Sequence, residues 1–299
     1  VHFPNSFSIG EPMKDHTTFA IGGPADLFVT VREAKALQAL LKKARDCDVP
    51  YLILGKGSNM LVRDGGIRGL VVHLDEGGAQ LVTGYELRAG GGVPLSQVSQ
   101  LAAAHGLGGL TFAIGIPGSL GGAVLMNAGA YGGEMKDVIT HVTACLPDGR
   151  TVAYSNEEMD FGYRKSKINQ QPEPIAITSV TVALTPADEE TVRATMREFS
   201  ARRREKQPLT LPSCGSTFKR PEGYFAGKLI EECGLKGCRV GGCSVSTLHA
   251  GFLVNDQQGS ACDYLSLIAQ VQKTVYEKTG VRLEPEVCIW GEDVCAKEI

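Results

Sequence analysis

The sequence contains no apolar run long enough to span a membrane, and its longest apolar stretches, such as Leu70–Leu74, have the length of a strand. Its first residues carry neither the basic region nor the apolar core of a secretory signal. No block of like charges is long enough to suggest a charged tail, and 30 basic against 33 acidic residues give a formal net charge of −3. That balance argues against a dedicated nucleic-acid binder, which would carry a basic face. We therefore expect a soluble, cytoplasmic protein with no nucleic-acid partner and no membrane insertion.

A disulfide framework is also missing. The nine cysteines are odd in number and scattered, which fits reduced thiols in a cytosolic protein. Cys233, Cys238 and Cys243 recur at regular intervals, but these intervals are wider than common zinc spacings, and the only histidine nearby is His249. We expect ordinary thiols here and no metal site.

Glycine, by contrast, is abundant: 37 of the 299 residues are glycine, above the usual ~7%. One cluster, Gly55–Asn59, follows a predicted strand and resembles a phosphate loop. It matches neither the dinucleotide fingerprint nor the P-loop pattern, because Met60 holds the third glycine position and a further strand follows. Backbone N–H groups in a tight glycine turn can still bind an anion. Taken alone, this loop is as consistent with a plain turn as with a binding site.

A second glycine cluster covers Gly115–Ala123 and Asn127–Gly132. Such a density lets the backbone run close to a flat or phosphorylated ligand. Leu120–Met126 could form a short helix whose N-terminus faces a pyrophosphate; the alternative is a tight packing corner. Two separate glycine loops in one domain imply a long dinucleotide held at several points.

The remaining pattern alternates strands and helices. We expect strands at Ala25–Val31, Tyr51–Leu54, Ile67–Leu74, Pro174–Leu184 and Val281–Ile289, and helices at Glu33–Asp46, Pro94–His105, Asp188–Lys206, Ala226–Cys233 and Ala261–Thr279. The helix at Asp188–Lys206 opens with acidic and closes with basic residues, which suits the helix dipole, and it is the natural link to a second domain. Ser260, Asp263 and Gly280 are typical of the start and stop of the last helix.

Three segments carry candidate chemistry. Tyr163–Lys167 is a compact basic cluster, or else a solvated surface turn. Ser216 follows a glycine but lacks the GxSxG pattern of an esterase elbow, and its simplest alternative is a turn serine. Glu284 and Glu286 lie two residues apart, which places both on one face of the predicted last strand. Such pairs are usually a solvated face, and spacing alone does not distinguish the two.

A set of ordered motifs resembles a known family. The segments are Thr18–Asp26, Leu54–Asn59, Gly115–Gly132, Tyr163–Ser166, Gly215–Lys219, Ala226–Ile230, His249–Asn255 and Leu283–Val287. Together they are similar to the UDP-N-acetylenolpyruvoylglucosamine reductases of cell-wall synthesis, over nearly the whole chain. The short distance from Ser216 to Glu286 matches the shorter form, which lacks an inserted substrate-covering loop.

This resemblance implies an α+β fold: an FAD-binding domain of the vanillyl-alcohol-oxidase (PCMH) type at residues 1–188, then a small α/β substrate-binding domain at 189–299. It implies an FAD-dependent oxidoreductase of peptidoglycan synthesis that reduces UDP-N-acetylglucosamine enolpyruvate to UDP-N-acetylmuramate. FAD would be bound non-covalently, NADPH would be the electron donor, and we expect a monomer.

The resemblance also implies a set of site residues. Arg164 would stabilise the enolate, Ser216 would protonate it, and Glu286, selected over Glu284, would assist. Residues expected to bind substrate are Tyr163, Lys206, Lys228 and Asn255. Residues expected to bind FAD are Gly55, Lys56, Gly57, Ser58, Asn59, Gly115, Ile116, Pro117, Gly118, Ser119, Gly122, Ala123, Asn127 and Gly129.

Two other functions compete with this one. A flavin oxidase of the same fold would need a substrate-deprotonating base and often a covalent flavin link, yet neither Gly55–Asn59 nor Gly115–Gly122 contains a histidine. A non-catalytic nucleotide-sugar binder would leave both glycine loops unexplained, together with the ordered Arg164, Ser216 and Glu286.

Overall fold

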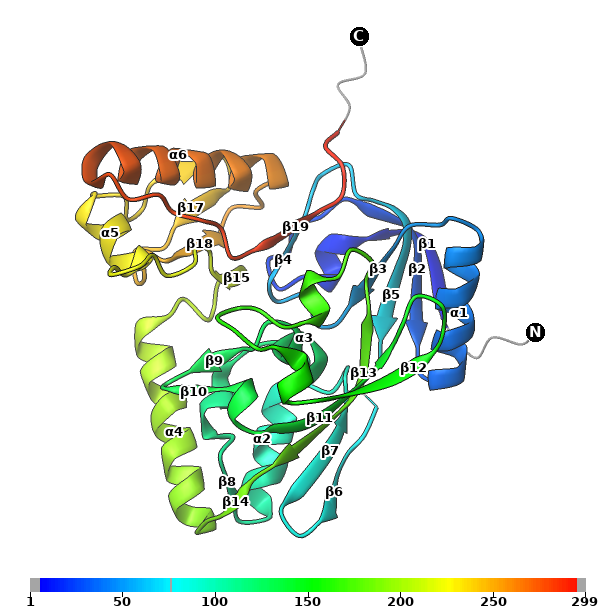
Figure 1. The fold of residues 1–299 in the computed structure, drawn as a ribbon. Coiled ribbons are helices and arrows are strands. Elements are labelled where there is room, and N and C mark those ends of the chain that lie inside the picture. Colours follow the sequence, from blue (N-terminus) through cyan, green and yellow to red (C-terminus); the bar gives the residue numbers. More distant parts are fainter. Residues whose placement is uncertain (1–5, 76, 295–299) are drawn as a thin grey trace. The chain divides into compact units, whose positions relative to one another are not determined.

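A computed structural model describes residues 6–75 and 77–294 of the chain (Figure 1). The chain forms two compact units: the first from the ranges 1–8, 27–56 and 69–202, and the second from 9–26, 57–68 and 203–299. Residues 1–5, on which part of the expectation of a missing secretory signal rests, lie outside the described residues. No helix in the described part of the chain is both long and apolar enough to cross a membrane.

Most of a four-stranded sheet belongs to the first unit. Its order is β1-β2-β5-β3, with β1 at Phe7–Pro12, β2 at Pro24–Val31, β5 at Ile67–Leu74 and β3 at Tyr51–Leu54. Helix α1 (Ala34–Asp46) buries Leu37, Leu41 and Ala44 in a cluster with strand residues such as Val72. Their spacing puts these three side chains on one face of the helix, which explains why this segment packs as a helix.

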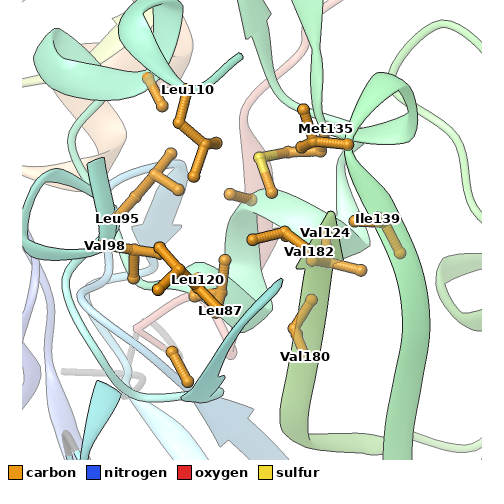
Figure 2. Packing of buried hydrophobic residues seen from close by; sticks show 14 of the residues in the cluster. Leu87, Leu95, Val98, Leu110, Leu120, Val124, Met135, Ile139, Val180 and Val182 are labelled. Atoms are coloured by element: carbon orange, nitrogen blue, oxygen red, sulfur yellow. The ribbon is translucent and has the colours of Figure 1, made fainter. Parts of the chain in front are cut away.

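A five-stranded antiparallel sheet also belongs to the first unit. Its order is β12-β11-β13-β7-β6, with strands at Thr151–Ser155, Ile139–Cys145, Ala176–Ala183, Glu86–Gly90 and Ala79–Thr83. Helices α2 (Leu95–Ala104) and α3 (Leu120–Leu125) share the largest hydrophobic core with this sheet. Figure 2 shows this packing, with Leu95 and Val98 of α2 and Leu120 and Val124 of α3 among side chains from the strands.

The smaller elements complete the first unit. Two-residue strands pair β8 (Leu107–Gly108) with β14 (Thr185–Pro186), and β9 (Gly129–Ala130) with β10 (Gly133–Glu134). Helix α4 spans Glu189–Lys206. The division between the units falls within it, after Arg202. Across the whole described chain, 3-10 helices lie at Met13–His16, Thr111–Gly115, Met135–Asp137, Glu157–Met159 and Ile168–Gln170.

The second unit has its own sheet and core. The sheet order is β15-β18-β17-β16, with strands at Ser213–Ser216, Phe252–Asn255, Cys243–Val245 and Arg239–Val240, and its helices are α5 (Ala226–Glu232) and α6 (Ala261–Thr279). Strand β4 (Met60–Val62) pairs in parallel with β19 (Cys288–Trp290). Tyr264 is fully buried and meets the ring of Phe19 edge-on at 4.4 Å between centroids. A segment from early in the chain is therefore part of this core.

Helix α6 is fixed at both ends. Ser260 and Asp263 form a reciprocal capping box, and Gly280 ends the helix in the left-handed conformation. The carboxylate of Asp64 adds a second cap, since it accepts from the backbone N–H groups of Ala261 at 2.8 Å and Cys262 at 3.0 Å. Because Asp64 follows β4, this cap ties an early loop of the second unit to its longest helix.

Most of the predicted elements are confirmed. The strands at Tyr51–Leu54 and Ile67–Leu74 and the helix at Ala261–Thr279 agree to the residue, and all but one of the others agree to within two residues at each end. The exception is Val281–Ile289, where the strand prediction is wrong: only its last two residues belong to a strand, β19. The earlier part contains Pro285, which lacks a backbone donor and makes one isolated bridge to Phe218. The face that a continuous strand would have given Glu284 and Glu286 therefore does not exist.

We expect Asp64→Ala to lower the free energy of unfolding of the second unit by about 1 kcal/mol, the usual cost of a lost N-terminal cap. Urea unfolding followed by circular dichroism would measure this. Asp46→Ala is the control, because Asp46 makes only an exposed i,i+4 pair with Lys42, worth about 0.5 kcal/mol or less. Equal effects of the two substitutions would contradict a capping role for Asp64.

Candidate active site

The two glycine loops meet within the first unit. A Cβ atom on Gly55 would lie 2.2 Å from Oγ of Ser119, so the start of the first loop runs directly against the second. Gly118 has a φ of 127°, which side chains disfavour, and its carbonyl accepts from Leu95 N–H at 3.0 Å. The remaining predicted cofactor residues here are Gly115 in a 3-10 helix, Ile116 and Pro117 in the link after it, Gly122 and Ala123 in α3, and Gly129 in β9.

Gly57 packs against backbone in the second unit. Its φ is 60°, and a Cβ atom there would lie 2.1 Å from the carbonyl oxygen of His16. The Gly57 carbonyl also accepts from Thr18 N–H at 3.2 Å. Glycine is therefore required at this turn for packing, whatever the turn binds. Lys56 and Ser58 flank it in the same turn.

The first N–H groups of α3 are already bonded to the protein. Leu120 N–H donates to the carbonyl of Val93, and Gly121 N–H to that of Gly91, each at 2.8 Å. Gly122 N–H donates to Oγ of Ser119 at 3.3 Å. These intramolecular bonds are those of a tight packing corner, and the pyrophosphate contact of this helix end stays a prediction.

A third glycine run, Gly90–Gly92, was missed in the sequence. Gly91 accepts from Gly121 at the start of α3, and a Cβ atom on Gly91 would lie 1.9 Å from the carbonyl oxygen of Ile177. A Cβ atom on Gly92 would lie 2.0 Å from that of Asp75. Three successive glycines, of which the first ends strand β7, were the available signal. Here they allow the backbones at Asp75, Ile177 and Gly121 to approach Gly91 and Gly92 closely.

Arg164 occupies an unusual position in a tight turn. Gly162 and Lys165 exchange backbone hydrogen bonds of 3.0 and 3.2 Å, which leaves Tyr163 and Arg164 as the two central residues. Arg164 has a φ of 54°, at the turn position that normally selects glycine or asparagine. Its guanidinium lies 5.1 Å from the centroid of the half-exposed Tyr163 ring. A long cationic side chain in a strained turn is the pattern often found at functional sites.

The side chain of Asn127 holds this turn by a hydrogen bond to its first residue. Its side chain is 1% exposed, and its Nδ2 donates to the carbonyl of Gly162 at 3.0 Å and to Oε2 of Glu134 at 2.7 Å. Its Oδ1 accepts from Lys136 N–H at 2.9 Å. The side chain that we expected to contact the cofactor thus bonds protein atoms at both ends of its amide.

Ser216 ends strand β15 in the second unit with its side chain exposed. Gly215, at φ 81°, turns the strand just before it. The Ser216 hydroxyl makes a long hydrogen bond of 3.4 Å to the carbonyl of Phe218. A surface hydroxyl held this loosely can turn toward a ligand.

A buried polar network next to Ser216 fixes the end of strand β15. The hydroxyl of Tyr264 lies 3.1 Å from both Sγ of Cys214 and Oγ1 of Thr217. Burial raises the pKa of the Cys214 thiol to about 11 and that of Tyr264 well above its ordinary value. Both groups therefore stay neutral near pH 7, and they hold the residues on either side of Gly215 and Ser216.

Glu284 and Glu286 have different environments in the structure. Glu284 is exposed, and its carboxylate pairs with Lys219. The backbone of Glu286 is held on both sides, because its N–H donates to the Thr217 carbonyl at 2.8 Å and its carbonyl accepts from Nδ2 of Asn59 at 3.2 Å. Glu286 therefore lies beside the segment that carries Ser216, and Asn59, expected at the cofactor, bonds to the Glu286 backbone.

The residues expected to bind substrate have different environments. Lys206 is exposed at the end of α4, and Lys228 is exposed on α5, where its Nζ lies 3.6 Å from Oε1 of Glu232. Asn255 is buried, and its Nδ2 donates to the carbonyls of Phe19 at 3.2 Å and Ala20 at 3.4 Å. Both lysine ammonium groups are accessible, whereas the Asn255 amide is used inside the protein.

No group of three metal-ligating side chains is arranged to hold an ion among residues 6–75 and 77–294. Eight of the nine cysteines lie in this part of the chain, and all eight are free thiols.

Comparison with known families matches two parts of the chain. Residues 25–155 match an FAD-binding domain, and residues 207–290 match the C-terminal domain of UDP-N-acetylenolpyruvoylglucosamine reductase. The predicted fold class, an FAD-binding domain followed by a small α/β domain, is confirmed, and so is FAD as the cofactor. The first match contains the two glycine loops that meet at Gly55 and Ser119, so the close backbone approach there suits a dinucleotide.

Similar proteins cover nearly all of the chain. UDP-N-acetylenolpyruvoylglucosamine reductases from Exiguobacterium sibiricum and Syntrophomonas wolfei are each 47% identical to it, over 95% and 97% of this chain and 93% and 97% of their own. The crystal structure of the reductase (MurB) from Thermus caldophilus superposes with a TM-score of 0.81 at 35% identity, and covers 97% of this chain and 100% of its own. The chain therefore belongs to the UDP-N-acetylenolpyruvoylglucosamine reductase family.

Proposed function

We propose that this protein reduces the enolpyruvyl double bond of UDP-N-acetylglucosamine enolpyruvate to give UDP-N-acetylmuramate, with NADPH as electron donor. The observation that carries the proposal is that both family domains and the whole ordered set of motifs lie in one chain. Bound FAD supplies the two-electron redox chemistry that connects NADPH oxidation to reduction of the carbon–carbon double bond.

Each glycine loop contributes to cofactor binding. We assign FAD binding to residues 1–188 and substrate binding to residues 189–299, ranges that contain the two family matches. The backbones of Gly55–Asn59 and Gly115–Ala123 would contact FAD, and Gly129 would lie at the end of this surface. Nδ2 of Asn59 donates to the Glu286 carbonyl, and the Asn127 amide bonds protein atoms through both its nitrogen and its oxygen. We therefore assign both residues a contact with the cofactor through the backbone.

Three side chains would act on the reacting double bond. Arg164 would stabilise the negative charge that develops on the carboxylate-bearing carbon, an effect worth roughly 10²–10³ in rate for one well-placed donor. The Ser216 hydroxyl would then donate its proton to that carbon. Glu286 would orient Arg164 or polarise the developing enol. The loose hydrogen bond of Ser216 and the tethered backbone of Glu286 support these roles.

The substrate would be positioned by further polar groups. The exposed ammonium groups of Lys206 and Lys228 suit its phosphates, and the Tyr163 ring suits a contact next to Arg164. Asn255 would act indirectly, by holding the loop at Phe19 and Ala20 through hydrogen bonds to their carbonyls. The reaction would take place in the cytoplasm, where NADPH and nucleotide sugars are available, and the enzyme would act as a monomer without nucleic acid.

An anaerobic titration would test the proposed function. The purified protein should have a flavin absorption band that NADPH bleaches and that the enolpyruvyl UDP-sugar restores. Recovery with oxygen but not with this substrate would indicate an oxidase, and a colourless protein that binds UDP-sugar would indicate a non-catalytic binder.

We expect Ser216→Ala to retain flavin reduction by NADPH and to slow substrate reduction by at least ~10², the usual contribution of a general acid. Stopped-flow absorbance would follow the two half-reactions separately. Ser213→Ala, in the same strand, should leave both rates near wild type. Substrate reduction at the wild-type rate in Ser216→Ala would show that Ser216 is not the acid.

We expect Gly57→Val to release FAD and to destabilise the protein, because its Cβ would collide with the carbonyl of His16. The flavin-to-protein absorbance ratio and the unfolding midpoint would measure the two effects. Gly84→Val is the matched control: Gly84 also has a positive φ, 45°, but no atom lies within 4 Å of its Cβ position. A fully yellow, stable Gly57→Val protein would remove this loop from the FAD site.

A further inference from the structure

The turn that carries Arg164 needs external support. Its conformation places a non-glycine residue at φ 54°, and such a position costs of order 1–3 kcal/mol unless the surroundings hold it. Within the turn, Gly162 and Lys165 exchange a pair of backbone hydrogen bonds, and the Arg164 guanidinium lies over the Tyr163 ring. Side chains of neighbouring segments add hydrogen bonds to the turn backbone.

Asn127 is a buried side chain that bonds to this turn. Its amide orientation follows from its partners, since the Gly162 carbonyl can only accept and Lys136 N–H can only donate. Both Nδ2 hydrogens are used, one on Gly162 and one on the Glu134 carboxylate. The amide is therefore a rigid link between the β9–β10 region and the start of the Arg164 turn.

Glu134, the other residue to which Asn127 Nδ2 donates, is also held by neighbouring groups. Glu134 forms a reciprocal capping box with Asp137, and its Oε2 lies 3.2 Å from Nζ of Lys136. On the other side of the turn, Asn169 Nδ2 donates to the Arg164 carbonyl at 3.1 Å, and Ser166 Oγ donates to the Leu125 carbonyl at 2.8 Å. The turn is thus held at its first residue by Asn127 and at its later residues by Ser166 and Asn169.

We propose that Asn127 is a positioning residue for Arg164: its side chain holds the Gly162–Lys165 turn so that the guanidinium is presented in one direction. This rests on the role proposed for Arg164. It gives Asn127 a function in the step that consumes the enolpyruvyl substrate, where the sequence indicated a cofactor contact.

Two substitutions remove the link without a backbone penalty. Asn127 has a φ of 41°, a conformation that glycine and aspartate tolerate better than other residues. Asn127→Gly deletes the whole amide. Asn127→Asp keeps the acceptor for Lys136 but replaces the donor to Gly162 by a carboxylate oxygen. Both variants lose the two Nδ2 hydrogen bonds, to Gly162 and to Glu134, and they differ in the acceptor for Lys136. An effect that they share is therefore attributable to the lost Nδ2 donor.

The half-reactions distinguish positioning from a structural or cofactor role. In stopped-flow experiments we expect both variants to be reduced by NADPH within about twofold of the wild-type rate. Reoxidation by the enolpyruvyl substrate should be slower by ~10–10², the range expected when a catalytic group is misplaced by about 1 Å. Asn156→Ala is the control, because Asn156 also donates to two carbonyls of this unit, those of Lys136 and Ile139, but does not bond to the turn. Its reoxidation rate should match wild type.

A double-mutant cycle with Arg164→Met completes the test. If Asn127 acts through Arg164, then adding Asn127→Gly to Arg164→Met should slow reoxidation by less than about twofold further. Additive effects, wild-type reoxidation in both Asn127 variants, or an equal loss of FAD binding and of flavin reduction would each overturn the positioning role. Wild-type reoxidation in Arg164→Met alone would instead overturn the role of Arg164, and the positioning role with it.

Discussion

Close approach between backbones is the constraint on which both units depend. At Gly55, Gly57 and Gly91, a single added carbon would lie about 2 Å from another atom of the protein. Two of these contacts, at Gly57 and Gly91, are with main-chain carbonyls, which cannot rotate away as a flexible side chain would. The loops proposed to bind FAD are therefore shaped first by how tightly their own backbones pack.

Backbone hydrogen bonds hold the residues proposed to act on substrate. Glu286 is held through its N–H and carbonyl, and Arg164 through the carbonyls of its own turn. This arrangement fixes the backbone position of each residue. The neutral Cys214–Tyr264–Thr217 network does the same for the strand end that carries Ser216.

Much of the fold could be predicted from the sequence. Helix α6 was predicted to the residue because its capping box, apolar face and terminal glycine agree, and local signals of this kind need no tertiary context. The strand predicted at Val281–Ile289 is wrong because contacts distant in the chain, and not local signals, determine the path of this segment. Alternation of apolar and polar residues suggested a strand, but Pro285 and long-range bonds to Thr217 and Lys219 set the local path. With that strand gone, spacing could not distinguish Glu284 from Glu286, whereas their hydrogen bonds to the backbones of Lys219 and Thr217 give them different positions.

The asparagines show why site residues were harder to predict than the fold. Loops without regular secondary structure leave backbone carbonyls unpaired, and a buried unpaired carbonyl is costly. Asn59 and Asn255 each donate to carbonyls in such loops, and Asn127 adds a second hydrogen bond to the Gly162 carbonyl, which also accepts from Lys165 N–H. Their amides thus supplement the backbone pairing of the loops. An asparagine in a glycine-rich segment suggests a ligand contact when only the sequence is known. The carbonyl that accepts its hydrogen bond belongs to a segment distant in the chain, so the sequence does not reveal it. The glycines that let a loop approach its ligand also remove regular hydrogen bonding, and the amides that replace this bonding cannot also bind the ligand through the same atoms.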